Sequence, residues 1–189
     1  MTIATEYAEY TIELEYDDVP EEVIDYAKKL TLDAIGISIG ARSRAESSDS
    51  FVDGVDSLAD GGEATVFATG ERLEPEYAAL LNGALIHSLD YDDTHRGASH
   101  HPGAPVIPAA IATAETVDRH VSGEELLAAI VAGYEVSCRL GQAINPESHY
   151  DRGFHGTATC GTFAATAAAG KIAGLDAEEL ENAFGLNGS

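Results

Sequence analysis

Apolar residues recur along most of this 189-residue chain at the three- and four-residue spacing of an α-helix. Polar and glycine-rich stretches interrupt the pattern and divide it into segments. It predicts seven helices, at about residues 20–40, 46–59, 75–92, 105–117, 122–144, 157–173 and 176–186. Residues 64–68 (ATVFA) predict one short strand, and the residues before the first helix predict a strand-like or irregular start.

Local signals support several of these helix starts. Pro75 suits a first helical turn, and Ser122 and Asp176 each precede a glutamate by three residues in a capping-box pattern. We find no internal repeat and no linker. We therefore expect a mainly α, multi-helix fold in which residues 1–189 form one unit, with at most a short strand near 64–68, and in which small residues let the helices pack closely.

The charge excludes two classes of partner. Ten Lys+Arg against 33 Asp+Glu give a formal net charge of −23, which repels nucleic acid and anionic membrane surfaces. Hydrophobic residues make up 44% of the chain, so we expect it to fold rather than remain disordered. The acid-rich, lysine-poor composition predicts a halophilic, haloarchaeal protein rather than an ordinary acidic cytosolic one.

The two cysteines have no CxxC partner and fit a reducing compartment. The N-terminal residues lack the positive and apolar regions of a signal peptide, and no stretch approaches 18 apolar residues. These features predict a cytoplasmic protein.

Acidic residues avoid two windows of the sequence. Residues 94–114 and 136–175 contain two acids and four bases, which gives them a local charge of +2 within a strongly negative chain. Burial explains this for the alanine-rich helices but not for the polar loops. A pocket for a small anion is the functional explanation.

Two polar segments carry the candidate chemistry. The first, residues 87–108, contains Asp90, Asp93 and Thr94, which one helical turn would bring to one side, together with His100 and His101. Crowded carboxylates and imidazoles suit a general acid or base. A metal site is the rival interpretation, although neither an HExxH motif nor an EF-hand pattern is present, and a solvated acidic helix end is the structural alternative.

The second segment, residues 145–162, leads into a helix of small residues. Its sequence around His155 and Thr157 would present backbone N–H groups and a hydroxyl to a carboxylate or phosphate, and Arg152 lies close by in the sequence. Alternatively, Thr157 only caps the helix. Cys160 would be either an activated thiol at this helix start or a buried packing residue.

The sequence resembles the MmgE/PrpD family, which includes 2-methylcitrate dehydratase, cis-aconitate decarboxylase and iminodisuccinate epimerase. Separated motifs carry the resemblance in the same order along residues 19–189. They are ATVFATGERLEPEYAALLNGALIHSLDYDDTH, the His101-Pro102 pair with PVIPAAIATAE, and GYEVSCRLGQAI through FHGTATCGTFAATAAAGKIAGLDAEELENAFGLNGS.

The resemblance implies a homodimer of a large helical domain with an α/β lid, which acts on small di- and tricarboxylic acids without an obligatory cofactor or metal. Residues 1–189 would be the N-terminal part of that helical domain. The rest of it, with a pocket lysine, and the lid would lie outside this chain, which by itself would be inactive. The reaction would remove a proton next to a carboxylate, with loss of water, loss of carbon dioxide after protonation, or return of the proton.

Carried over by motif, Asp90 and Thr94 match active-site positions of the DxDDT run. His101 matches the loop histidine, with His100 as a possible substitute, and His155 matches the histidine before the Gly-Thr helix. We expect His101 to perform acid/base work, with Asp90 and Thr94 orienting it or binding substrate. The residues expected to bind the substrate are His155, Thr157, Asp93, His100 and Arg152.

The leading hypothesis is a lyase of the 2-methylcitrate dehydratase type, a hydro-lyase of propionate catabolism. A cis-aconitate-type decarboxylase and an iminodisuccinate-type epimerase are the alternatives within the family. From other classes, an inactive fragment that only dimerises and an acidic metal-binding protein remain.

Overall fold

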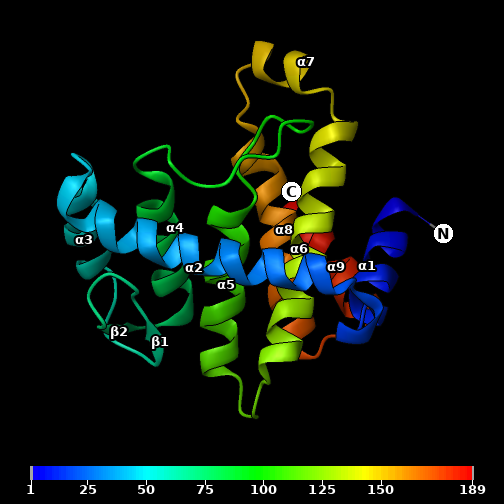
Figure 1. Cartoon of the computed structure of the whole chain (residues 1–189), viewed down its shortest axis with the longest axis horizontal. Coiled ribbons are helices and arrows are strands. Elements are labelled where there is room, and N and C mark those ends of the chain that lie inside the picture. Colours follow the sequence, from blue (N-terminus) through cyan, green and yellow to red (C-terminus); the bar gives the residue numbers. More distant parts are fainter. Residues whose placement is uncertain (1, 189) are drawn as a thin grey trace.

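The computed structural model describes residues 2–188 and is mainly α, as the sequence predicts (Figure 1). The first half contains α1 (Ile3–Glu13), the short 3-10 helix η1 (Tyr16–Asp18), α2 (Glu21–Arg44), α3 (Ser48–Asp56), β1 (Ala64–Thr65), β2 (Arg72–Leu73) and α4 (Pro75–His87). The second half contains α5 (Gly103–Thr116), α6 (Gly123–Ala143), α7 (Pro146–Asp151), α8 (Gly156–Ala173) and α9 (Ala177–Asn187).

Helices α5, α6 and α8 pack against one another at the centre, and α4 packs on α5. The long helix α2 crosses this group and contacts α4, α5 and α6 (Figure 1). The central core is apolar and includes Val106, Ile107, Ile130, Ala164 and Ala168, all buried. One polar loop leads into α5 and another leads into α8. Because α5 and α8 pack together, the ends of these two loops lie close to each other.

Several helix starts follow the predicted local signals. In α6 and α9, the side chains of Ser122 and Asp176 accept hydrogen bonds from backbone N–H groups three residues later, and the glutamates there return the bond. Pro75 occupies the first turn of α4. These ends are local in origin, because a capping box satisfies N–H groups that the helix itself leaves unpaired.

The N-terminal region differs from the prediction of a strand-like or irregular start. Residues 3–13 form α1, whose first turn is closed by a capping box between Thr2 and Thr5. The helix packs along α9, where Ala8 lies in a core cluster with Leu180 and Phe184. Its stability thus depends on a partner from the other end of the chain.

Three other boundaries differ. The predicted strand at 64–68 is reduced to β1, which pairs antiparallel with the unpredicted β2 in the register Ala64–Leu73 and Thr65–Arg72. The predicted loop at 145–153 contains α7. Helix α4 ends at His87 instead of continuing to about residue 92. Asp90 then adopts a left-handed conformation with φ of 52°, which a continued helix would not allow.

Within residues 2–188, no helix combines the length and the hydrophobicity that crossing a bilayer requires.

Candidate active site

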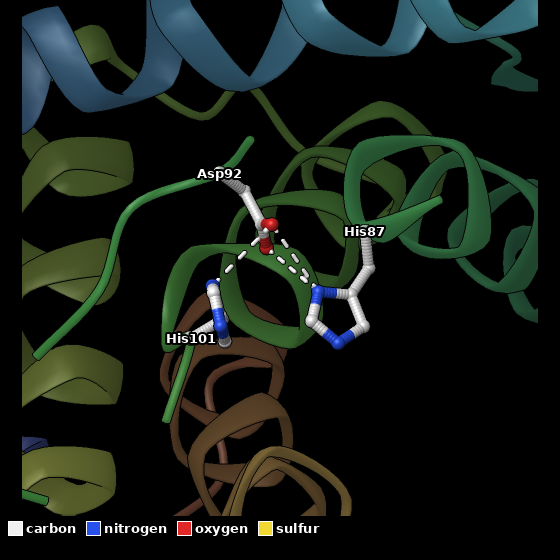
Figure 2. A group of neighbouring side chains, drawn as sticks. All are labelled: His87, Asp92 and His101. Atoms are coloured by element: carbon white, nitrogen blue, oxygen red, sulfur yellow. Dashed lines mark hydrogen bonds and ion pairs between the residues drawn. The ribbon is translucent and has the colours of Figure 1, made fainter. Parts of the chain in front are cut away.

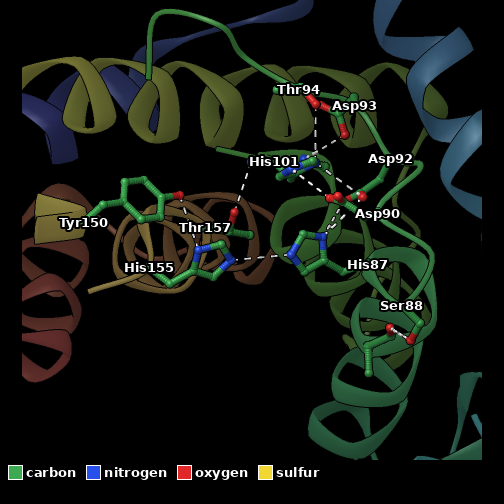
Figure 3. A network of polar contacts seen from close by, with 12 residues as sticks. His87, Ser88, Asp90, Asp92, Asp93, Thr94, His101, Tyr150, His155 and Thr157 are labelled. Carbon is green, nitrogen blue, oxygen red and sulfur yellow. Dashed lines mark hydrogen bonds and ion pairs between the residues drawn. The ribbon is translucent and has the colours of Figure 1, made fainter. Parts of the chain in front are cut away.

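Side chains from three parts of the fold meet at one end of the central helices (Figure 3). His87 is the last residue of α4, and Asp92 follows in the loop after it. His101 lies two residues before α5, and His155 is the N-cap of α8. Because α4, α5 and α8 pack together, their ends bring these four residues into contact.

Asp92 is the centre of the cluster and lies between two imidazole rings (Figure 2). Its carboxylate oxygens lie 3.0 and 3.2 Å from His87 Nδ1, and one of them lies 3.4 Å from His101 Nδ1. The Asp92 side chain is 1% exposed, whereas those of His87 and His101 are 31% and 17% exposed. A buried carboxylate therefore orients two rings that keep an open side.

His101 also contacts the two residues that the motif assigned to it. Its Nε2 lies 3.5 Å from an oxygen of Asp90, and its Nδ1 lies 3.5 Å from the Thr94 hydroxyl. Residues 90–94 are not helical, so the expected reason for their proximity was wrong. The loop, turned by the left-handed Asp90, curves around the His101 ring and presents both side chains to it.

His155 faces the same centre from the opposite side. Its Nε2 lies 3.5 Å from Nε2 of His87, and its Nδ1 lies 3.3 Å from the Tyr150 hydroxyl. The Tyr150 hydroxyl donates a 2.9 Å hydrogen bond to the carbonyl of Ser99. A continuous line of polar contacts therefore runs from Tyr150 through His155 and His87 to Asp92 (Figure 3).

The surroundings shift the pKa values of these rings in opposite directions. The hydrogen bond to Asp92 raises the pKa of His87, helped by the charges of Asp92 and Asp90 and opposed by partial burial. Partial burial lowers the pKa of His155, and the nearby His87 and His101 lower it further. His87 is thus inclined to carry a proton, whereas His155 is inclined to stay neutral with one bare ring nitrogen, so the pair offers both an acid form and a base form.

Asp93 faces away from these rings toward the start of α5. One of its oxygens accepts a 3.1 Å hydrogen bond from the Gly103 N–H. Burial raises the pKa of Asp93 to about 6, a rise that the hydroxyl of Tyr134 and the Gly103 N–H partly oppose. The geometry gives Asp93 a role in holding the loop on α5, and its expected contact with substrate stays a prediction.

Two further candidate residues, His100 and Thr157, are buried. His100 is fully buried, with its Nε2 2.9 Å from the Ser137 hydroxyl of α6, and burial lowers its pKa to about 4. Thr157 is 7% exposed, and its hydroxyl accepts the backbone N–H of His101 at 3.1 Å. Both side chains therefore help to hold the loop in place, and Nδ1 of the buried His100 has no hydrogen-bond partner among the described residues.

Arg152 lies apart from the cluster. It is exposed, and its Nε donates to the Ser148 carbonyl at 3.2 Å. The expected contact of Arg152 with substrate therefore stays a prediction that its present hydrogen bond does not test.

The sequence analysis did not select His87, Asp92 or Tyr150 as site residues. His87 fell inside a predicted helix, where a histidine is ordinarily a packing residue. The signal available was that Asp92 lies between Asp90 and Asp93, both of which were selected. For Tyr150 the local sequence contains no such signal, because its role depends on contacts with Ser99 and His155.

The side chains of the cluster are also of the types that bind metal ions. Among the described residues, His87, Asp92 and His101 offer ligand atoms that all lie within 4.8 Å of one another. Hydrogen bonds from ring nitrogens to a carboxylate account for these separations without an ion. We therefore interpret the group as an imidazole–carboxylate cluster.

The cysteines show no sign of activation. Cys160 is 3% exposed, and burial raises the pKa of its thiol. Burial also raises the pKa of Cys138 to about 12. The packing interpretation of Cys160 is therefore the one that the structure supports.

A groove of about 680 Å³ lies beside the cluster, between α2 and α6. Its lining includes Asp92, Asp93 and Thr94 but none of His87, His101 and His155. Arg139 in this groove is already paired with Glu135 at 2.6 Å. An acidic lining with a neutralised cation disfavours an anion, so the imidazole cluster is the better candidate site.

The cluster contains carboxylates, although the charge pattern of the sequence indicated a site that acidic residues avoid. Asp90 and Asp92 lie just before the acid-poor window that starts at residue 94, yet both contact His101. The site therefore combines imidazoles with carboxylates, and an anion would rely on protonated rings.

Fold and site together define a helical domain that carries an imidazole–carboxylate cluster suited to moving protons. Residues 5–189 match the MmgE/PrpD N-terminal domain, and the chain belongs to the MmgE/PrpD family. This confirms the family resemblance of the sequence motifs.

Curated relatives align with nearly the whole chain. The cis-aconitate decarboxylase-like protein oryM of Aspergillus oryzae is 32% identical over 189 residues, which cover 97% of this chain and 39% of the relative. Cis-aconitate decarboxylase of Aspergillus terreus is 32% identical over 188 residues, which cover 97% of this chain and 38% of the relative. The human cis-aconitate decarboxylase is 39% identical over 117 residues, or 61% of this chain and 24% of the relative. The chain thus spans about two fifths of the length of the two fungal relatives.

Proposed function

We propose that this chain supplies the acid/base part of the active site of a lyase that acts on a small di- or tricarboxylic acid. The observation that carries the proposal is the cluster in which His87 and His101 contact the buried carboxylate of Asp92 and His155 contacts His87. Two rings held by one carboxylate, facing a third ring of lower pKa, can take a proton from carbon and return one.

Within the family, we propose decarboxylation of a cis-aconitate-like tricarboxylate. The names of the relatives support this reaction over the dehydration of 2-methylcitrate, which the sequence analysis placed first. In this reaction a proton from an imidazole adds to carbon, and the C–C bond to a carboxylate breaks with loss of carbon dioxide. Dehydration and epimerisation begin instead with removal of a proton next to a carboxylate, and they are outcomes of the same assay.

We also propose that residues 1–189 form part of a longer helical domain that dimerises. The share of the relatives that the chain covers supports this, as does the open side of the cluster, where Asp90 is 84% exposed. A trianionic substrate beside two carboxylates needs additional positive charge, which a residue outside this chain would supply.

The test compares the gene product that contains residues 1–189 with the 189-residue chain. Each is supplied with cis-aconitate, 2-methylcitrate or iminodisuccinate, with and without EDTA, and the products are identified. We expect carbon dioxide release from cis-aconitate by the longer protein, unchanged by EDTA, and no turnover by the 189-residue chain. Loss of activity with EDTA and recovery with zinc would contradict the metal-free mechanism.

Two variants assign the site. His101→Ala and His155→Ala should each lower kcat by about 100-fold or more, which is the usual contribution of a general acid or base. The matched control is His120→Ala, because His120 is exposed in the connection between α5 and α6. Wild-type rates in either site variant would remove that residue from the proposed mechanism.

A further inference from the structure

The contact between His87 and His155 is a head-to-head approach of two ring nitrogens. The Nε2 atoms are 3.5 Å apart, and the ring centroids are 5.8 Å apart with planes inclined by 22°. The centroid separation exceeds the Nε2–Nε2 separation by about twice the distance from a ring centroid to a ring nitrogen. Both Nε2 atoms therefore lie close to the line that joins the two centroids. At this separation a water molecule does not fit between them.

The tautomer of His155 is determined by Tyr150. A phenol hydroxyl has one hydrogen, and that of Tyr150 is donated to the Ser99 carbonyl, which can only accept. The Tyr150 oxygen therefore accepts from Nδ1–H of His155. A neutral His155 with its proton on Nδ1 has a bare Nε2 that faces His87.

The proton on Nδ1 of His87 is determined in the same way. Asp92 as a carboxylate can only accept, so Nδ1 of His87 carries a hydrogen. If His87 were neutral, its Nε2 would also be bare, and two lone pairs would face each other. A hydrogen on that Nε2 turns the repulsion into an attraction between a donor and an acceptor.

The charged groups around His87 favour this extra proton. Asp92 and Asp90 face it from the loop after α4, and both raise its pKa. The opposing groups are the rings of His101, from the loop before α5, and of His155, from the start of α8. The raised pKa of His87 shows that the carboxylates prevail over partial burial.

We propose that His87 and His155 share one proton between their Nε2 atoms, so that His87 is a second acid/base residue of this site. The inference rests on the proposed function for its catalytic meaning. When a substrate separates the rings, Nε2–H of His87 can move to a carbon that carries an electron pair. His87 is then neutral, with Nδ1–H still held by Asp92, and Nε2 of His155 remains free to accept a proton from carbon.

The direct test is the protonation state of the rings in the ligand-free 189-residue chain. Long-range ¹H–¹⁵N spectra of ¹⁵N-labelled protein distinguish bare from protonated ring nitrogens at each pH. At pH 7 we expect both nitrogens of His87 to be protonated and His155 to be protonated on Nδ1 alone. A neutral His87, or a His155 with its proton on Nε2, would overturn the proposal.

Tyr150→Phe tests whether the contact with Tyr150 determines the tautomer of His155. Without the phenol oxygen, His155 should shift toward the tautomer protonated on Nε2, and the titration midpoint of His87 should fall. Tyr26→Phe is the matched control, because Tyr26 is 61% exposed on α2. Unchanged ring states in a folded Tyr150→Phe chain would contradict the proposed chain of contacts; if this variant does not fold, the wild-type spectra decide alone.

The shared proton and the proposed function can be disproved separately. The expected spectra without turnover by the longer protein would overturn the proposed function and leave the shared proton intact. Turnover with an ordinary neutral His87 would overturn the shared proton alone. In an active longer protein, His87→Gln should lower kcat by about 100-fold and change the pH profile of kcat, whereas a purely structural role would leave that profile unchanged.

Discussion

The backbone N–H of His101 donates a 3.1 Å hydrogen bond to the hydroxyl of Thr157, a residue 56 positions away. Thr157 lies in the first turn of α8, and His101 lies just before α5. The bond therefore ties one histidine of the site to the helix start that carries another, His155. This contact therefore helps to fix the position of His101 relative to His155.

Replacing Thr157 tests this link. Thr157→Val keeps the shape but leaves the His101 N–H without its acceptor, which should lower the free energy of unfolding by about 1–3 kcal/mol. Thr157→Ser retains a hydroxyl and is the matched control. Urea denaturation of the two variants measures the difference, and equal stability of the valine and serine variants would contradict a role for the hydrogen bond.

Asp93→Asn should stabilise the protein at high pH. Because the folded-state pKa is about 6, above the ordinary value, the contribution of Asp93 to stability falls as pH rises from about 4 to about 6 and stays low above that. Asparagine keeps an acceptor for the Gly103 N–H without a buried charge. We expect a gain of about 1–2 kcal/mol at pH 8 and a smaller change at pH 4.

Denaturation at both pH values measures this effect. Asp90→Asn is the control, because the Asp90 side chain is 84% exposed. A loss of stability in Asp93→Asn that is larger at pH 8 than at pH 4 would show that the carboxylate form is required and would contradict this prediction.

Two glycines in helix interiors should respond oppositely to alanine. A Cβ on Gly161 of α8 would lie 2.8 Å from the Pro105 side chain, whereas a Cβ on Gly36 of α2 meets nothing within 4 Å. Gly161→Ala should therefore destabilise by about 1–3 kcal/mol through overpacking of α5 on α8. Gly36→Ala should stabilise by about 0.5–1 kcal/mol through helix propensity. Thermal unfolding of both variants checks the contrast, which similar shifts in Tm would contradict.

The thiols should be unreactive in the folded chain. Cys160 is buried, and burial raises the thiol pKa of both Cys160 and Cys138, so little thiolate is present at neutral pH. We expect Ellman's reagent to modify both cysteines slowly at pH 7.5 and rapidly in guanidinium chloride. Fast modification of Cys160 in the native protein would restore the activated-thiol hypothesis.

Local sequence was sufficient for most of the helices. The apolar spacing within α2, α5, α6 and α8 and the capping residues Ser122 and Asp176 act over four or five residues, so they can be recognised without a fold. Helix α1 and strand β2 were missed because each is stabilised by a distant partner, α9 for the helix and β1 for the strand.

The candidate site shows the same division between local and distant causes. His101 and His155 were selected from motifs, and the structure places His101 against Asp92 and His155 against His87. His100 and His101 are adjacent, and the sequence did not decide which of them faces the site. His100 pairs with His95 in a β-bridge, and successive side chains of extended backbone point to opposite sides. Only one of the two can therefore face the cluster.

The sequence by itself determined the helical class, the family and the two polar segments, because periodicity, caps and motifs are properties of neighbouring residues. Only the tertiary structure decided that Asp92 holds two rings, that His87 faces His155 and that His100 is buried. These relationships join residues that the packing of α4, α5 and α8 brings together, and such distances depend on the whole core.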